Sequence, residues 1–271
     1  MVTFPNCKIN LGLNILQKRE DGFHNIETIF FPVGLFDALE IIPSQNKTKL
    51  TVTGISTGAA ADNLCLKAFY LLKKDYPQLP EVNIHLHKEI PLGAGLGGGS
   101  ADAAFTLQAI NKKFNLYIPE KEMHVHALQL GSDCPFFLIN KPCLATGRGE
   151  VLEHAVISLS GYKILLIHPG IHISTAEAFS KIEPAIPVKK IKEIIQQPVE
   201  SWKEELSNDF EKNIFEKYPQ LKKIKEDLYN GGAIYASMSG SGSTVFGIFI
   251  KNSIINFKAE PAYFYKLVDA A

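Results

Sequence analysis

The sequence lacks the features of a secreted, disulfide-rich or membrane-spanning protein. Its 271 residues include only 4 cysteines, which are widely spaced and form no Cys-x-x-Cys pair. Neither a disulfide framework nor a structural zinc site is therefore expected. The N-terminus has no basic and apolar leader, and no apolar run approaches the roughly 20 residues that cross a bilayer. These absences predict a cytoplasmic protein with reduced thiols.

The sequence also lacks an excess of charge of either sign. Lys and Arg together number 28, as do Asp and Glu, so the formal net charge is zero. A neutral chain has no general attraction to nucleic acid or to an acidic membrane, and it must bind an anion through a local site. We expect small-molecule partners rather than nucleic acid or membrane, and a monomer or weak homodimer.

One glycine-rich stretch dominates the chain, with the sequence PLGAGLGGGSADAA over residues 91–104. Before it, apolar and polar residues alternate over 82–87, which predicts a strand. After it, Ala103, Leu107 and Ile110 have helical spacing. The glycines are therefore expected at a helix N-terminus, where free backbone N–H groups and the helix dipole favour phosphate. A triphosphate is the expected ligand.

This stretch differs from the two commonest nucleotide-binding loops. No lysine follows the glycines as in the Gly-Lys-Ser/Thr phosphate loop, and the Gly-x-Gly-x-x-Gly dinucleotide fingerprint is not in its usual place after a first βα turn. A glycine-rich connection can also be only a flexible turn. Five glycines between a strand and a helix, followed by Ser100, favour phosphate binding over that alternative.

The same stretch resembles the phosphate-binding motif of the GHMP kinases, the family of galactokinase, homoserine kinase and mevalonate kinase. This resemblance implies an α+β fold of two domains. The N-terminal α/β domain would span 1–155 and be of a kind also found in a ribosomal protein. The C-terminal α+β domain would span 156–271. The active site would lie in the cleft between them. ATP and Mg²⁺ would be the cofactors. The form Gly-Leu-Gly-Gly-Gly-Ser most resembles the branch that phosphorylates the 2-hydroxyl of 4-diphosphocytidyl-2-C-methyl-D-erythritol in the non-mevalonate isoprenoid pathway.

The resemblance implies two catalytic residues. Lys8 and Asn10 match the Lys-x-Asn of the family's N-terminal strand, which reaches the substrate hydroxyl, and Asp133 matches the catalytic aspartate of its Gly-Ser/Ala-Asp-x-Pro. A carboxylate is a weak base for an alcohol, so a nearby lysine would stabilise the developing alkoxide. From the pattern alone, Lys8 and Asn10 could instead be the solvated face of a strand over 8–15, and Asp133 could merely cap a helix.

Residues that bind the acceptor are also implied. The turn Asp21-Gly22-Phe23-His24 resembles a sequence whose aromatic ring stacks on cytosine while the histidine reads the polar edge of the base. Phe23 stands where that branch often has Tyr, so stacking would survive without a phenol hydrogen bond. Phe179 matches an aromatic residue that faces cytidine, although it could equally be a core phenylalanine. Gly240, Ser241 and Gly242 match the C-terminal glycine-rich motif that closes over phosphates and substrate.

The ATP site implied by the resemblance surrounds the glycine run. Asn63 and Lys88 match positions bordering the nucleotide base, and Ser100 is a possible Mg²⁺ ligand. Their alternatives are an ordinary first-turn residue for Asn63, after an N-cap at Asp62, and a solvated strand-end lysine for Lys88. Many members of the branch have a second serine where this chain has Ala101. The remaining residues expected to contact ATP are Pro91, Gly93, Gly95, Leu96, Gly97, Gly98 and Gly99.

Further patterns complete the predicted organisation. A helix ending at Gly131 precedes Asp133, and a hairpin is one explanation of residues 147–150, which also resemble the branch's Gly-x-Gly-Glu turn. The second half predicts a strand over 163–167, a capping box from Ser174, surface helix and linkage over 183–207, helices over 208–218 and 221–230, and a final strand over 244–250.

Three other functions fit the sequence less well. Another kinase of the same family would act on homoserine, mevalonate or a sugar, but those branches do not usually carry the Asp21–His24 turn together with three consecutive glycines. A non-catalytic nucleotide-binding module would have no need of Lys8 and Asp133. An RNA-binding protein would need a basic surface patch, which the neutral composition makes a poor fit.

Overall fold

A computed structural model describes residues 1–56 and 62–270, and it divides the chain into two compact units. The first unit comprises Met1–Cys7, Leu35–Leu92 and Gly97–Asn140. The second comprises Lys8–Gly34, Gly93–Leu96 and Lys141–Ala271, of which residue 271 lies outside the described residues. These units do not follow a single division of the chain after residue 155, because the strands over 8–34 group with the C-terminal half.

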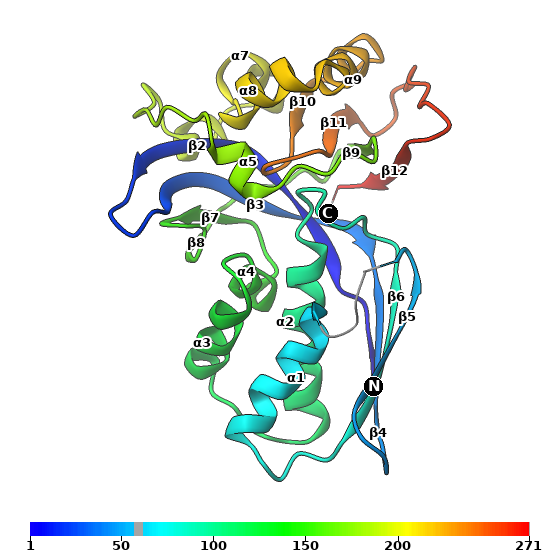
Figure 1. The fold of residues 1–271 in the computed structure, drawn as a ribbon. Coiled ribbons are helices and arrows are strands. Elements are labelled where there is room, and N and C mark those ends of the chain that lie inside the picture. Colours follow the sequence, from blue (N-terminus) through cyan, green and yellow to red (C-terminus); the bar gives the residue numbers. More distant parts are fainter. Residues whose placement is uncertain (57–61, 271) are drawn as a thin grey trace. The chain divides into compact units, whose positions relative to one another are not determined.

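The first unit is a four-stranded sheet with helices (Figure 1). Its strand order is β1-β4-β6-β5, with β5 and β6 parallel and the other neighbours antiparallel. The strands are β1 (Val2–Thr3), β4 (Ala38–Pro43), β5 (Lys49–Gly54) and β6 (Val82–Lys88). The helices are α1 (Leu64–Asp75), α2 (Gly98–Lys113), α3 (Glu120–Leu130) and α4 (Cys134–Ile139).

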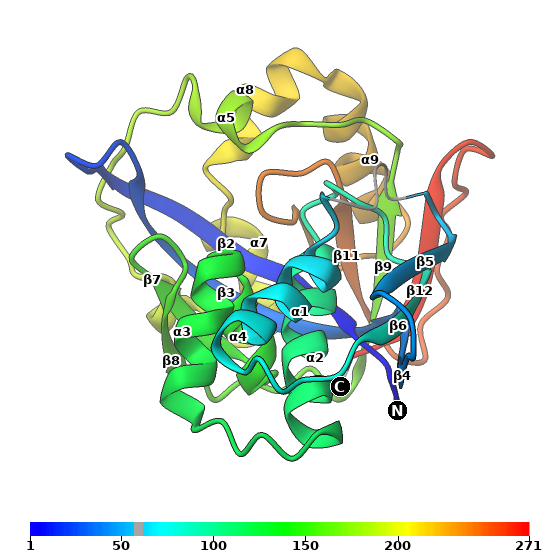
Figure 2. The ribbon, with the colours of Figure 1, turned by 60° about the horizontal axis from the view of Figure 1, so that its bottom comes forward.

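One apolar core holds this unit together. Along β6, buried and exposed residues alternate strictly, as the sequence predicts. The buried face of the sheet packs against helices α1 to α4, which Figures 1 and 2 show gathered on one side of β4, β5 and β6. Phe69 of α1 and Leu107 and Ile110 of α2 are fully buried in this core. The packing fixes where α2 begins, and thereby the end of the glycine run.

The second unit contains two four-stranded sheets. The first has the order β2-β3-β7-β8. Its strands are β2 (Asn6–Lys18), β3 (His24–Phe36), β7 (Cys143–Thr146) and β8 (Val151–His154). The hairpin predicted at 147–150 joins β7 to β8 and is confirmed.

The second sheet of this unit has the order β10-β11-β9-β12, all antiparallel. Its strands are β9 (Tyr162–His168), β10 (Tyr235–Met238), β11 (Val245–Ile250) and β12 (Phe264–Asp269). The expectation that β11 would be the final strand is wrong, since β12 follows and pairs with β9. β12 is the edge strand of this sheet and is largely exposed, whereas β11 is almost entirely buried.

Short helices connect and cover this sheet. Ser174 is the N-cap of α5, as predicted, since its hydroxyl accepts a hydrogen bond from the Glu177 backbone N–H. The other half of the predicted capping box is not formed among the described residues, because the Glu177 carboxylate accepts from Lys217 and Tyr218 instead. Residues 183–207 form three short helical segments, in which Trp202 is nonetheless buried. The helices are α5 (Thr175–Phe179), α6 (Ile191–Ile194), the 3₁₀ turn η2 (Val199–Ser201), α7 (Trp202–Glu205), α8 (Phe210–Lys217) and α9 (Pro219–Asn230).

The cysteines and the helix lengths bear on the expected lack of disulfides and of membrane spans. The four cysteines, Cys7, Cys65, Cys134 and Cys143, are all free and buried. Burial raises the pKa of the Cys134 thiol to about 12 and that of Cys143 to about 11, which keeps both protonated and unreactive. Within residues 1–56 and 62–270, no helix combines the length and apolar character needed to cross a bilayer.

Candidate active site

The glycine run leads directly into the first turn of α2. Gly97 occupies the N-cap position in the left-handed conformation (φ +69°), and α2 begins at Gly98. The first turn of α2 contains no acidic residue, so its free N–H groups meet no carboxylate there. The predicted helix N-terminus is confirmed, and it has the character of an anion site.

Gly95 is required by its surroundings. Its φ is +79°, and a Cβ atom there would lie 2.0 Å from the carbonyl oxygen of Ser239. The Ser239 hydroxyl donates a 2.8 Å hydrogen bond to the Gly95 carbonyl, and Thr244 N–H donates to Ala94. The first part of the glycine run is thus packed against the Ser239–Gly242 segment, and the predicted closure of this segment over phosphates and substrate remains a prediction.

The Ser239–Gly242 segment is itself held by an asparagine that sequence analysis missed. Asn208 is buried, and its side-chain amide donates 2.8 Å hydrogen bonds to the carbonyls of Met238 and Gly240. Its side-chain oxygen accepts from Phe210 N–H at the start of α8. The dipeptide Asn208-Asp209 just before a helical pattern is a capping signal, which could have drawn attention to this residue.

The lysine and asparagine predicted near the substrate lie deep in β2. Lys8 is 3% exposed and Asn10 is 2% exposed, so the alternative of a solvated strand face is wrong. The Lys8 ammonium donates hydrogen bonds to Asn10 Oδ1 at 2.6 Å and to the Gly95 carbonyl at 3.1 Å. Asn10 in turn donates to Thr28, and its backbone N–H donates to Ser239 Oγ. Lys8 and Asn10 therefore belong to one hydrogen-bonded cluster with the first part of the glycine run.

Lys8 and Asn10 are buried because β2 is covered on both faces from Asn6 to Ile15. Gly12 interrupts the regular strand geometry with a φ of +67°, and a Cβ atom there would lie 2.5 Å from the Leu206 side chain. Alternation in the sequence reveals that one face is apolar, but it cannot reveal that the polar face is also covered by distant residues.

Lys88 lies in a buried ion cluster rather than at a solvated strand end. Its side chain is 0% exposed, and its ammonium forms ion pairs with Asp37 and, at 2.8 Å, with Asp102. Asp37 also accepts hydrogen bonds from the backbone N–H groups of Glu89 and Ile90, at 2.7 and 2.9 Å. The cluster fixes the point where the chain leaves β6. A direct contact between Lys88 and a nucleotide remains a prediction, and the two carboxylates compete for that ammonium.

One ammonium cannot neutralise two carboxylates, and the pKa values reflect this. Burial lowers the pKa of Lys88, but Asp102 and Asp37 together outweigh it and raise that pKa above its ordinary value. Burial raises the pKa of Asp102 to about 7, although Lys88 opposes the shift. Asp102 Oδ1 has no hydrogen-bond partner among the described residues. The cluster therefore favours a charged Lys88 and a proton on Asp102.

This shift predicts how stability depends on pH. A carboxyl group with a raised pKa in the folded state contributes stability below its ordinary pKa of 3.8, and that contribution is lost as the pH rises to about 7. Asp102→Asn keeps an oxygen acceptor for Lys88 but cannot ionise. We expect its melting temperature to fall less than that of the wild type between pH 5 and pH 8, as measured by thermal unfolding.

The control for this experiment is Asp62→Asn, because the Asp62 side chain is 87% exposed. This control should leave the pH dependence of the melting temperature unchanged. An Asp102→Asn curve parallel to that of the wild type would show that Asp102 is ionised throughout this range.

Asn63, and not Asp62, caps α1. The Asn63 side-chain oxygen accepts a 2.9 Å hydrogen bond from Cys65 N–H, so the predicted N-cap at Asp62 is wrong by one position. Both residues are common N-caps, and sequence alone does not choose between them. The capping bond engages the oxygen of Asn63, and its contact with the nucleotide base remains a prediction.

The starts of α2 and α4 lie next to each other in the first unit. The Ser100 hydroxyl contacts the Cys134 thiol, and a Cβ atom on Gly131 would lie 3.8 Å from Ser100 Oγ. Gly131 and Cys134 flank Asp133, which is half-buried at the N-cap position of α4. Its side chain forms no capping hydrogen bond to the described residues of α4. The fold thus places the predicted base beside the first turn of the predicted phosphate-binding helix.

The aromatic residues predicted to read cytosine lie together in the second unit. The His24 ring stacks on Phe179, with centroids 4.7 Å apart and planes 15° apart. Phe179 is half-buried and also packs edge-on against Phe210. It is therefore partly a core residue, which was the alternative to contact with cytidine. Burial, with a smaller effect of Lys18, lowers the pKa of His24 and favours the neutral ring.

Phe23 presents an open ring at the start of this cluster. Its side chain is 52% exposed, and the Arg148 guanidinium lies 4.8 Å from its ring centroid. The sequence around Arg148 indicates a hairpin or a Gly-x-Gly-Glu turn and gives no sign of this contact. A strand pairing that brings residue 148 to residue 23 cannot be read from local sequence. An aromatic face beside a cation suits a planar, partly anionic ligand.

The two-unit fold and the glycine-capped helix beside the Asp133 segment are typical of a class of phosphotransferases. Comparison with known proteins agrees. The family model of the GHMP kinases N terminal domain matches residues 63–141, and that of the GHMP kinases C terminal matches residues 190–263. Together they cover more than half of the chain. The chain belongs to the GHMP kinases.

Within the GHMP kinases, the chain is similar to relatives and to a solved structure that share one name. A protein of Cytophaga hutchinsonii named 4-diphosphocytidyl-2-C-methyl-D-erythritol kinase is 53% identical over 251 residues, or 92% of each chain. A protein of the same name from Bacteroides fragilis is 51% identical over 253 residues, also 92% of each chain. The crystal structure of a 4-(cytidine 5'-diphospho)-2C-methyl-D-erythritol kinase matches all of both chains with a TM-score of 0.78 and 28% identity.

Proposed function

We propose that this protein transfers the γ-phosphoryl group of ATP to the 2-hydroxyl of 4-diphosphocytidyl-2-C-methyl-D-erythritol. One structural observation carries the kinase chemistry: a glycine-capped helix N-terminus lies beside the segment that carries Asp133. The identity of the acceptor is supported by relatives of that name, which are 51–53% identical over nearly the whole chain.

The proposed roles follow from the chemistry of phosphoryl transfer. Such reactions depend on positioning and on neutralising charge at the transferred group. The free N–H groups from Gly97 to Ser100 would bind phosphate oxygens. Asp133 would take the proton of the acceptor hydroxyl, and Lys8 would stabilise the negative charge that develops there.

A magnesium ion fits this proposal through Ser100. No cluster of three or more His, Cys, Asp or Glu residues suited to a metal is present in the part of the chain that the structure describes. Mg²⁺ commonly keeps several waters and binds substrate phosphates with only one or two protein ligands, and the Ser100 hydroxyl is an oxygen donor at the first turn of α2. When bound, the ion would offset charge on the phosphates.

The acceptor is proposed to be recognised through its base. Phe23→Ala should raise the KM for the cytidylylated acceptor by about 5- to 150-fold, because stacking a base on an aromatic ring is worth about 1–3 kcal/mol. The KM for ATP should not change. Initial-rate kinetics with each substrate varied in turn would measure both constants.

Phe23→Tyr is the matched control, since it keeps the ring and adds only a hydroxyl at an exposed position. Its acceptor KM should stay within about threefold of the wild-type value. If Phe23→Ala left the acceptor KM unchanged, the base would have to be recognised elsewhere.

A panel of acceptors tests the function as a whole. ADP release with ATP and Mg²⁺ would be measured with 4-diphosphocytidyl-2-C-methyl-D-erythritol, homoserine, mevalonate and galactose. We expect turnover with the cytidylylated polyol alone. Turnover with another acceptor would keep the kinase and overturn the assigned substrate, whereas ATP binding without any turnover would favour a non-catalytic module. A cytoplasmic location and a monomer or weak homodimer remain predictions, and light scattering tests the second.

A further inference from the structure

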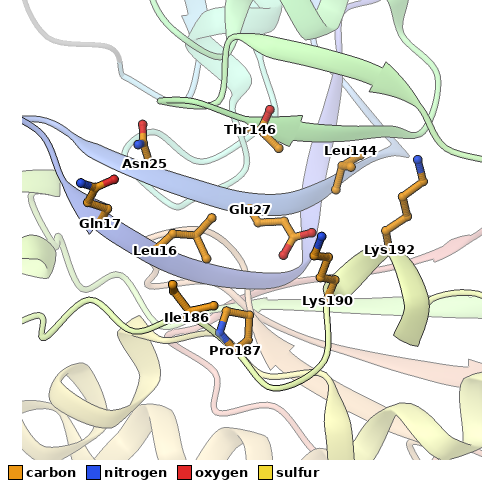
Figure 3. Close-up of a pocket in the computed structure, with 10 residues that line it drawn as sticks. All are labelled: Leu16, Gln17, Asn25, Glu27, Leu144, Thr146, Ile186, Pro187, Lys190 and Lys192. Carbon is orange, nitrogen blue, oxygen red and sulfur yellow. The ribbon is translucent and has the colours of Figure 1, made fainter.

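The second unit contains a cavity of about 490 Å³ formed by residues outside the predicted catalytic and acceptor-binding sets (Figure 3). Strands β2, β3 and β7 supply one side of it, and the segment before and within α6 supplies the other. Its volume lies in the range of small-molecule sites.

This cavity lies on the opposite face of β3 from the aromatic cluster. Side chains alternate between the two faces of a strand. His24 stacks on Phe179 and Ile26 packs against the apolar core, whereas Asn25 and Glu27 line the cavity. A ligand there would therefore not compete with the cytosine contacts proposed for Phe23 and His24.

Glu27 is the first observation that points to a ligand. It is 7% exposed, and among the described residues its carboxylate takes part in no hydrogen bond or ion pair. Figure 3 shows this carboxylate among the side chains that line the cavity. A carboxylate on a largely buried side chain gains from a cationic hydrogen-bond donor, so such a group in the cavity would be favoured there.

Lys190 supplies the opposite charge. It lines the same cavity on an exposed side chain, and no ion pair between its ammonium and an acid is present among the described residues. The neighbouring Lys192 is different, because Glu153 holds its ammonium at 2.5 Å. The cavity thus offers one carboxylate and one ammonium to a ligand.

The rest of the lining is mostly apolar. Leu16 and Leu144 come from the sheet, and Ile186 and Pro187 come from the segment that covers it. Ile186 is 86% exposed, so part of its apolar surface is available to a ligand. An apolar body bound there would be stabilised by the surface that it removes from water.

We propose that this cavity binds a small zwitterion with an apolar body, of the type of a branched-chain or aromatic α-amino acid. The ligand's ammonium group would donate hydrogen bonds to Glu27, and its carboxylate would pair with Lys190. Its side chain would pack against Leu16, Leu144 and Pro187. No covalent step is involved.

Titration calorimetry of the full chain with L-leucine and L-phenylalanine tests this proposal. Isoamylamine, which lacks the carboxylate of leucine, and 4-methylpentanoate, which lacks its ammonium group, are the matched probes. We expect at least one of the amino acids to bind, and both truncated probes to bind at least tenfold more weakly than leucine or not at all. Glu27→Gln and Lys190→Met should each weaken amino-acid binding at least tenfold.

Two control variants separate the site from general charge effects. Glu20→Gln and Lys181→Met alter exposed residues outside the cavity and should leave binding unchanged. Thermal unfolding would establish that Glu27→Gln remains folded. The absence of binding by both amino acids, equal binding of isoamylamine or 4-methylpentanoate, or binding that survives both cavity substitutions would overturn the proposal.

Discussion

Asp133→Ala is expected to reduce kcat by about 10²- to 10⁴-fold, the range typical for the loss of a general base. Asp133 stands at the N-cap of α4, beside the residues that contact Ser100 at the start of α2. Its substitution removes the proposed proton acceptor but leaves the free N–H groups of α2 in place. Steady-state kinetics with the cytidylylated acceptor would measure the loss, and calorimetry would show that ATP still binds.

Asp133→Asn separates the charge from the shape of the side chain. It preserves size and one oxygen acceptor, and it should lose nearly as much activity as the alanine variant. A turnover number near that of the wild type for either variant, in a chain with an unchanged melting temperature, would remove Asp133 from the mechanism. A loss of ATP binding in parallel with turnover would instead indicate a role in holding the nucleotide.

Lys8→Ala is expected to lower kcat by about 10²- to 10³-fold, as when one group that stabilises transition-state charge is removed. The Lys8 ammonium is buried and already oriented by Asn10 and the Gly95 carbonyl, so little rearrangement is needed when charge develops nearby. Because the interaction strengthens as the alkoxide forms, kcat should fall more than KM rises. Kinetics with both substrates would distinguish these effects.

The contribution of Lys8 to stability must be measured separately from its contribution to catalysis. Its removal takes a hydrogen-bond donor away from both Asn10 Oδ1 and the Gly95 carbonyl. Lys8→Met keeps most of the aliphatic stem in the buried strand and removes only the charge and the donors. We expect Lys8→Met to be as inactive as Lys8→Ala and more stable to heat. Activity that tracked melting temperature across the two variants would argue that Lys8 only holds the glycine run in place.

The glycine-run helix could be predicted because its signals are local. Strand alternation before residue 88, glycines at 93–99 and helical spacing after Ala103 lie within about 30 residues, and β6 and α2 follow them closely. The prediction required no knowledge of distant partners. The same is true of the hairpin between β7 and β8 and of the start of α5 at Ser174.

The contacts around this helix could not be predicted, because each joins distant parts of the chain. Asn208 holds Gly240, Asp37 accepts from Glu89 and pairs with Lys88, and Ser239 binds Gly95. A polar residue in an alternating strand can face water or a buried network, and its neighbours in sequence do not decide which. The burial of Lys8 and Lys88 therefore emerged only from the structure.

The discontinuous second unit has a consequence for the order in which the protein can fold during synthesis. Strands β2 and β3 leave the ribosome well before β7, which pairs with β3 and begins only at Cys143, and before β12, which ends at Asp269. Every residue of the first unit, by contrast, is available once Asn140 has emerged. Since domains generally fold as units, the N-terminal strands of the second unit must wait for most of the chain, with their apolar faces exposed to other nascent proteins and to chaperones in the meantime.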